Sequence, residues 1–179
     1  MRVRIRKAVL EDIPALEALI PESVRVLGAG YYTPEQIEGS LGTVFGVDSQ
    51  LIRDGTYFVA EAEGKVVGCG GWSRRRTLFG SDQAPEKDEA WLDPSLDAAR
   101  IRAFFVHPAW ARQGIGSRIM QRCEAAAVEE GFSRLELVAT LPGEPLYRAH
   151  GFSAAEHFEV PLSNGASLPV VRMSKGITG

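Results

Sequence analysis

The sequence predicts one α/β (α+β) domain over residues 1–179, with a mixed central sheet of about seven strands flanked by helices. Three observations predict this class. The chain has 179 residues, of which 45% are hydrophobic, and this suits one globular core. Segments with the alternating pattern of strands are interspersed with segments that have helical spacing. Two pairs of strand segments are separated by tight turns, which favours antiparallel hairpins.

The N-terminal segments predict a strand, a helix and then one or two short helices. Residues 3–6 alternate charged and apolar side chains, as a half-buried strand does. Residues 13–20 carry apolar side chains at helical spacing, and Pro21 is expected to end that helix. Residues 23–55 have weaker signals, although Thr33 and Pro34 form a good helix start that apolar side chains follow.

The next two strands form a predicted hairpin. Residues 57–62 and 65–72 are rich in β-forming side chains and are joined at Glu63 and Gly64. Three glycines thin out the second strand: Gly68, Gly70 and Gly71. Glycines inside a strand predict either a bulge or a ligand close to the backbone.

Residues 74–99 form a long connection that lacks apolar periodicity. It opens with three consecutive arginines, at 74–76, and continues with an acidic run. Charge runs are usually solvated faces, so this segment does not indicate the charge of a substrate. Connections of this length are either functional or mobile.

The C-terminal part predicts alternating strands and helices. Residues 101–106 and 135–139 form strands on either side of a helix that begins near Ile115 and stops at Gly131. Residues 145–150 have space for a short helix that Gly151 ends. Residues 152–162 and 168–173 pair across a turn at 163–165.

Composition excludes several classes of function. The net charge of -3 and the pI near 5.7 give no general attraction to nucleic acid or to anionic lipid. Cys69 and Cys123 lack the paired spacing of metal or redox sites and are expected to be reduced and semi-buried. The chain contains no apolar stretch for export and none near the ~20 residues of a membrane span, so a cytoplasmic location is expected.

The most informative segment is 106–117, which runs from a strand through a loop into a helix. Gly114 and Gly116 lack the β-carbons that would keep an anion from the backbone, and the first N–H groups of a helix are unpaired. Arg112 adds a charged donor at the mouth of this turn, and Ser117 adds a hydroxyl. The segment therefore suits a pyrophosphate, against the alternative that the glycines only cap or pack a helix.

Two other phosphate-binding motifs fit poorly. A nucleoside-triphosphate loop needs Gly-Lys-Ser or Gly-Lys-Thr, which does not follow these glycines. A dinucleotide fingerprint needs a third glycine where this chain has Ile119, although Glu136 stands at about the ribose-binding distance. A nicotinamide or flavin enzyme is therefore a remote alternative.

The segment instead resembles the signature of the GNAT superfamily of N-acetyltransferases, with its strand, proline-containing loop, glycine pair and long helix. The order of predicted elements over the whole chain is similar to that of the family, which implies a mixed, mostly antiparallel sheet. The resemblance implies that acetyl-CoA is the cosubstrate and that its pantetheine arm lies along Phe104, Phe105 and Val106. Its pyrophosphate would lie over six consecutive residues: Arg112, Gln113, Gly114, Ile115, Gly116 and Ser117. Ala111 departs from the family pattern, which usually has Arg or Gln there.

A second motif, residues 146–152, resembles the later GNAT motif, in which the tyrosine is the usual general acid. Tyr147 is therefore the predicted acid, because a phenol with a pKa of about 10 can donate a proton to the thiolate that leaves. The alternative is a structural tyrosine with a satisfied hydroxyl. The base that deprotonates the amine is unassigned, with Glu61, Glu136 and Asp97 as candidates.

The resemblance also implies an acceptor pocket that Tyr31 and Tyr32 shape, with core packing the stronger alternative for at least one of them. The predicted function is acetyl transfer from acetyl-CoA to a primary amine of a small molecule or peptide. A non-catalytic acyl-CoA sensor on the same fold is the alternative. His107, His150 and His157 lack metal-ligand spacing, so no metal is expected. The family also admits a homodimer, and neither nucleic acid nor membrane is an expected partner.

Overall fold

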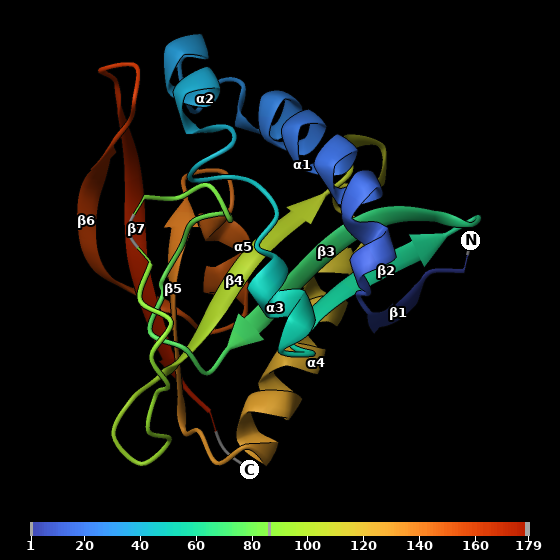
Figure 1. Cartoon of the computed structure of the whole chain (residues 1–179), viewed down its shortest axis with the longest axis vertical. Helices are drawn as coiled ribbons and strands as arrows, with labels where there is room; N and C mark the ends of the chain where they lie inside the picture. The colour runs from blue at the N-terminus through green and yellow to red at the C-terminus, as the bar shows by residue number, and fades with distance from the viewer. Residues whose placement is uncertain (1, 86, 178–179) are drawn as a thin grey trace.

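One twisted sheet organises the protein in a computed structural model that describes residues 2–85 and 87–177 (Figure 1). The strands follow the order β1-β2-β3-β4-β5-β7-β6. Their bounds are β1 Arg4–Lys7, β2 Tyr57–Ala62, β3 Lys65–Ser73, β4 Ala99–Val106, β5 Arg134–Thr140, β6 Ser153–Pro161 and β7 Ser167–Gly176. Every neighbouring pair is antiparallel except β4 and β5, which are parallel. The predicted mixed, mostly antiparallel sheet of seven strands is confirmed.

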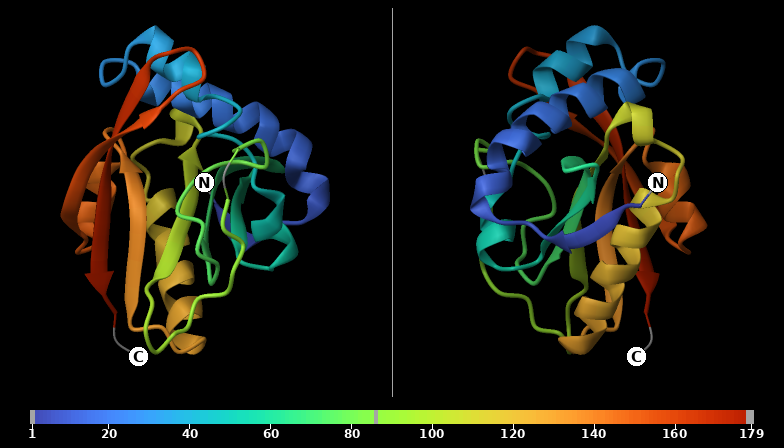
Figure 2. Two further views of the ribbon diagram at one scale, coloured as in Figure 1. Left: turned by 60° about the vertical axis from the view of Figure 1, so that its left-hand side comes forward. Right: turned by 90° about the vertical axis from the view of Figure 1, so that its right-hand side faces the viewer.

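Helices cover both faces of the sheet (Figures 1 and 2). One face carries α1 (Ile13–Gly28), α2 (Pro34–Ser40) and α3 (Ser49–Arg53), and the other carries α4 (Ile115–Glu129) and α5 (Glu144–Ala149). Two short 3₁₀ turns, η1 (Leu10–Asp12) and η2 (Pro108–Trp110), lie before α1 and after β4. Each face has its own apolar core, because the sheet separates the side chains that point to α1 from those that point to α4.

The first helix does not end at Pro21, as the sequence predicted, but continues to Gly28. Proline removes one backbone donor, so the carbonyl of Glu17 loses its helical partner. Glu17 is exposed to water, which can hydrate that carbonyl. Ile20 before the proline and Val24 after it are both buried, so packing of the same helix face against the sheet outweighs the lost hydrogen bond.

The predicted bulge occurs where β3 meets β4. Cys69 pairs with Phe105 but Gly71 pairs with Arg102, so β4 carries one extra residue in this interval. Ala103 adopts a positive φ of 55° there. At Gly70 a β-carbon would lie 2.6 Å from Cδ1 of Phe104, so a side chain of the protein itself occupies the space that glycine leaves.

The long connection folds back on itself and forms the strap, defined here as residues 74–85 and 87–98. Backbone bonds join Arg76 N to Ala90 O at 2.9 Å and Thr77 N to Asp88 O at 2.9 Å. Further along the strap, Ser81 N donates to Thr43 O at 2.8 Å. The strap is therefore attached to the segment between α2 and α3 on the α1 face, whereas Leu92 further along the strap packs into the core on the α4 face.

Both cysteines are free, but they are fully buried rather than semi-buried. Cys69 lies in the sheet and Cys123 on the inner face of α4. Burial raises the pKa of the Cys69 thiol to about 12 and also raises that of Cys123, so both stay protonated near neutral pH. Within residues 2–85 and 87–177, no helix is long and apolar enough to cross a membrane.

Candidate active site

A cavity of about 640 Å³ opens where β4 and β5 part. In the described residues, these strands pair only at Ala99 with Leu135 and at Arg100 with Glu136. Beyond these positions the two strands no longer pair, and residues of both line the cavity. Lining residues come from both apolar cores, so the cavity passes from the α4 face of the sheet to the α1 face.

The helix α4 begins at one side of this cavity. Its N-cap is Gly114, with a φ of 80° and no side-chain cap. The first helical hydrogen bond is donated by Arg118 N to Gly114 O at 3.0 Å, which leaves the N–H groups of residues 115–117 at the open end of the helix. Gly116 has a different role, because a β-carbon there would approach Cδ2 of Leu146 at 3.0 Å. Gly114 is therefore required for its positive φ, whereas Gly116 is required because Leu146 leaves little room for a β-carbon.

The side chains around this turn differ in position. Arg112 lines the cavity and is exposed, with a positive φ of 61°. Ser117 also lines it, and its Oγ lies 2.9 Å from Nε2 of His150. Gln113 does not line the cavity; it is exposed and its Nε2 donates to the carbonyl of Ala109 at 3.4 Å. Of the predicted residues in this turn, Gln113 alone has no place in the cavity wall.

The end of β4 forms the wall between the two faces. Phe104, Phe105 and Val106 all line the cavity. The ring of Phe105 packs on Phe45 with centroids 6.0 Å apart, on the α1 face. The ring of Phe104 packs on Tyr147 with centroids 6.2 Å apart, on the α4 face. From residue 101 onward β4 pairs only with β3 in the described registers, so its other edge faces the cavity.

Tyr147 lies on α5 and lines the cavity although only 9% of its surface is exposed. Its ring is held between Phe104 and Phe152 in edge-to-face contacts. Burial raises the pKa of Tyr147 above its usual value, with a smaller contribution from Cys123. The phenol is therefore protonated at neutral pH. Its hydroxyl makes no hydrogen bond to another described residue.

Tyr31 and Tyr32 both line the cavity but differ in environment. Tyr31 is 53% exposed at the rim. Tyr32 is buried, and its hydroxyl donates to Pro169 O at 2.7 Å and accepts from Leu141 N at 2.9 Å. Burial raises the pKa of Tyr32, and the bond from Leu141 opposes this. Tyr32 thus connects the α1–α2 segment to β7. This matches the alternative that at least one of the two tyrosines packs in the core.

The three candidate bases lie elsewhere. Glu61 accepts hydrogen bonds from Arg4 and Arg6 at the β1 edge, and Glu136 pairs with Arg172 at 3.2 Å. Asp97 accepts from the backbone of the strap. None of these three lines the cavity. In residues 2–85 and 87–177, no carboxylate contributes to its wall, and no cluster of three or more His, Cys, Asp or Glu side chains could hold a metal.

Sequence reasoning missed the contribution of the strap. Leu78, Phe79 and Gly80 form part of the cavity wall. A buried ion network holds them there, because Nη2 of Arg102 donates to Asp48 Oδ2 at 2.9 Å and to the carbonyl of Gly80 at 2.8 Å. No local pattern marks these residues, since the partners come from three separate segments of the chain.

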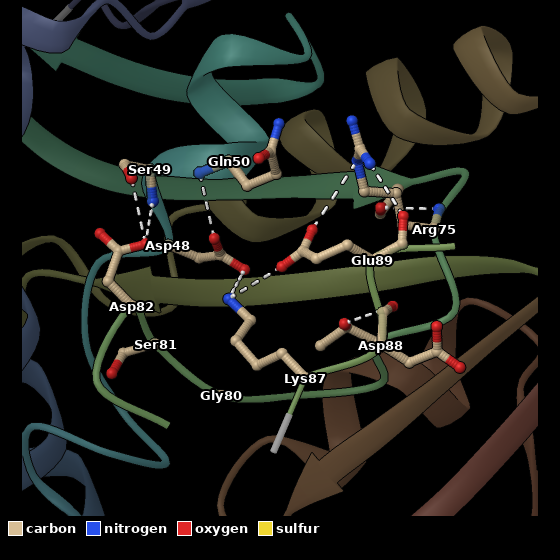
Figure 3. Close-up of polar contacts among 12 residues, drawn as sticks. Asp48, Ser49, Gln50, Arg75, Gly80, Ser81, Asp82, Lys87, Asp88 and Glu89 are labelled. Atoms are coloured by element: carbon tan, nitrogen blue, oxygen red, sulfur yellow. Dashed lines mark hydrogen bonds and ion pairs between the residues drawn. The ribbon is translucent and has the colours of Figure 1, made fainter. Parts of the chain in front are cut away.

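The network also includes Lys87, whose Nζ lies 2.7 Å from Asp48 Oδ2. Figure 3 shows Lys87 reaching from the strap to Asp48 and to Glu89. Asp48 in addition accepts a hydrogen bond from Gln50 N at the start of α3. The strap is therefore attached both to β4 and to the N-terminus of α3.

Solved structures share this fold. A GCN5-related N-acetyltransferase from Rhodopseudomonas palustris is 20% identical, with 99% of this chain and 97% of that chain covered and a TM-score of 0.72. The PaiA N-acetyltransferase from Thermoplasma acidophilum, in complex with coenzyme A, is 16% identical, with 99% and 100% covered and a TM-score of 0.66. The ribosomal-protein-S18-alanine N-acetyltransferase from Escherichia coli is 16% identical, with 99% and 96% covered and a TM-score of 0.61.

The chain has the fold of these N-acetyltransferases, with a cavity beside an uncapped helix N-terminus. No curated protein matches the chain in sequence. The model of the acetyltransferase (GNAT) family matches residues 28–152, which is more than half of the chain. The chain belongs to this family, as the glycine turn and the tyrosine motif had indicated.

Proposed function

We propose that the protein transfers an acetyl group from acetyl-CoA to a primary amine of a small molecule or peptide, by direct attack of the amine on the thioester. The observation that carries the proposal is that the open N-terminus of α4 and the hydroxyl-bearing ring of Tyr147 belong to one cavity. The Thermoplasma acidophilum relative binds coenzyme A, which supports the same cosubstrate here.

The donor fits the α4 side of the cavity. Its pyrophosphate would accept hydrogen bonds from the N–H groups of residues 115–117, where the helix dipole favours an anion. Arg112 would add a charged donor, and Ser117, held by His150, would add a hydroxyl. The pantetheine amides would pair with the unpaired edge of β4 at residues 104–106, as an additional strand does. Gln113 has only its backbone to offer, because its side chain lies outside the cavity.

The chemistry then requires a proton for sulfur. The amine nitrogen attacks the thioester carbon, a tetrahedral intermediate forms, and the carbon–sulfur bond breaks as the carbonyl is restored. The nitrogen loses its extra proton to solvent, the sulfur takes a proton from the hydroxyl of Tyr147, and the phenolate regains a proton from solvent. The phenol of Tyr147 is protonated at neutral pH, so its proton is available when charge develops on sulfur. The products are an N-acetylamine and free coenzyme A.

Replacing Tyr147 with Phe tests the role of the hydroxyl. Tyr147→Phe keeps the ring between Phe104 and Phe152, so the cavity stays intact. General acid catalysis contributes about 10²- to 10⁴-fold, so kcat should fall by that order while the KM for acetyl-CoA changes little. Thiol release measures turnover, and calorimetry measures acetyl-CoA binding. An unchanged kcat would show that another group protonates sulfur.

A further inference from the structure

The half of the cavity on the α1 face is lined almost entirely by apolar side chains. We call this half the acceptor chamber. Its walls come from α1, the segment before α3, the strap and β5, and include Val24, Leu27, Phe45, Leu78, Phe79 and Val138. Ser23 from α1 and Tyr32 also line the cavity, and the hydroxyl of Tyr32 is already bonded to Pro169 and Leu141.

Charges are absent from the chamber or are neutralised. Among the described residues lining the whole cavity, the ionisable side chains are three tyrosines and two arginines. Arg112 belongs to the α4 turn. Arg102 is 3% exposed and is bonded to Asp48, which also binds Lys87. Oε1 of Glu89 lies 3.9 Å from Nζ of Lys87, so two carboxylates balance the two cations. The described wall therefore offers no carboxylate to a second ammonium group and no free cation to an acidic group.

An apolar chamber penalises any charge that enters it unpaired. A second charge on the acceptor would lose its hydration without gaining a partner. The reacting amine experiences the same effect, since apolar surroundings lower the pKa of an ammonium and favour the neutral, nucleophilic form. Because the amine is then already neutral, the reaction does not need a carboxylate base in the described wall of the cavity.

From the lining we infer that the acceptor is a primary amine on an uncharged, apolar body, and that the strap residues 78–80 form part of the surface that selects it. This inference rests on the proposed acetyl transfer and names its substrate class. Diamines, polycationic amines and amino acids with free carboxylates are disfavoured. An amine at the start of a peptide fits when its neighbouring side chain is apolar.

A series of amines with four carbons each tests the effect of a second charge on the acceptor. Butylamine, 1,4-diaminobutane and 4-aminobutanoate differ only in whether the far end is neutral, cationic or anionic. With acetyl-CoA as donor, kcat/KM for butylamine should exceed that of either charged analogue by tenfold or more, and 2-phenylethylamine should react at least as fast as butylamine. Equal or faster turnover of a charged analogue overturns the inference, and so does turnover of none of the four while acetyl-CoA still binds. Absence of acetyl-CoA binding overturns the proposed function instead.

A variant of the strap tests the wall itself. Leu78→Asp places a carboxylate in the chamber, so the ratio of kcat/KM for 1,4-diaminobutane to that for butylamine should rise by tenfold or more. Leu96→Asp is the matched control, because Leu96 lies on the same strap, is 73% exposed and is outside the cavity. An unchanged ratio in a Leu78→Asp protein that still binds acetyl-CoA overturns the role of the strap. If Leu78→Asp does not fold, Phe79→Asp adds the same charge from the strap and is judged by the same ratio.

Discussion

At the scale of single residues, the carboxylate of Asp48 interacts with three different segments of the chain. It is 5% exposed, and its carboxylate binds Arg102 from β4 and Lys87 from the strap. Its other oxygen accepts from Gln50 N and caps α3. A buried ion pair contributes little net stability compared with an apolar replacement, but removal of one partner leaves a charge without compensation. Asp48 is therefore expected to be sensitive to substitution.

Asp48→Asn should reduce the free energy of unfolding by about 3–5 kcal/mol, because two cations lose their buried anion while the capping oxygen remains. Urea unfolding followed by circular dichroism measures this change. Glu38→Gln is the control, since Glu38 pairs with Arg25 on an exposed surface and its loss should leave the midpoint unchanged. Equal effects of the two substitutions would contradict the importance of burial.

At the scale of elements, the start of α4 determines whether an anion can approach the backbone. Gly114 has a φ of 80°, and no atom lies within 4 Å of where its β-carbon would be. An alanine there would be strained by backbone conformation and not by collision. Because the N–H groups of residues 115–117 follow directly, any relaxation of that strain changes their direction.

Gly114→Ala should destabilise the fold by about 1–2 kcal/mol, the cost of a left-handed conformation for alanine. It should also weaken coenzyme A binding by about tenfold, which corresponds to about 1.4 kcal/mol. Gly165→Ala is a matched control, because Gly165 has a φ of 88° and open space around it but lies in the β6–β7 turn outside the cavity. Calorimetry should show weaker binding only in Gly114→Ala. The same loss in both variants would mean that binding tracks stability alone.

At the scale of the whole molecule, the cavity separates two groups of strands. β1 to β4 lie on one side and β5 to β7 on the other, and the described registers join them at only two residue pairs. A ligand that lies between β4 and β5 would contact both groups at once. Binding should therefore stabilise the folded chain as a unit and not only the loop around α4.

Acetyl-CoA at one hundred times its Kd should stabilise the protein by about 2.7 kcal/mol. For a chain of this size, that corresponds to a rise in Tm of about 5–10 °C. NAD at the same concentration should leave the Tm unchanged, because the third glycine of a dinucleotide site is replaced by Ile119. Differential scanning calorimetry makes the comparison, and a larger shift with NAD would favour the dinucleotide alternative.

Much of the fold was predictable because its signals are local. The β-forming side chains of β2 and β3, the glycine turn before α4 and the β6–β7 turn are local signals, and each predicted element is confirmed within a few residues. Pro21 misled the prediction of α1, since the helix is stabilised by packing that a local pattern does not contain. The prediction for Gln113 failed in a similar way, because a sequence pattern does not show in which direction a side chain in a loop points.

By itself the sequence determined the order of the elements, the family and the glycine turn at which the backbone N–H groups of α4 are unpaired. Only the tertiary structure decided that β4 and β5 part, that Arg102 is neutralised by Asp48 and that the strap becomes a wall of the acceptor chamber. These features join residues far apart in the chain. Their free energy comes from burial and charge pairing, which exist only after the segments have packed together.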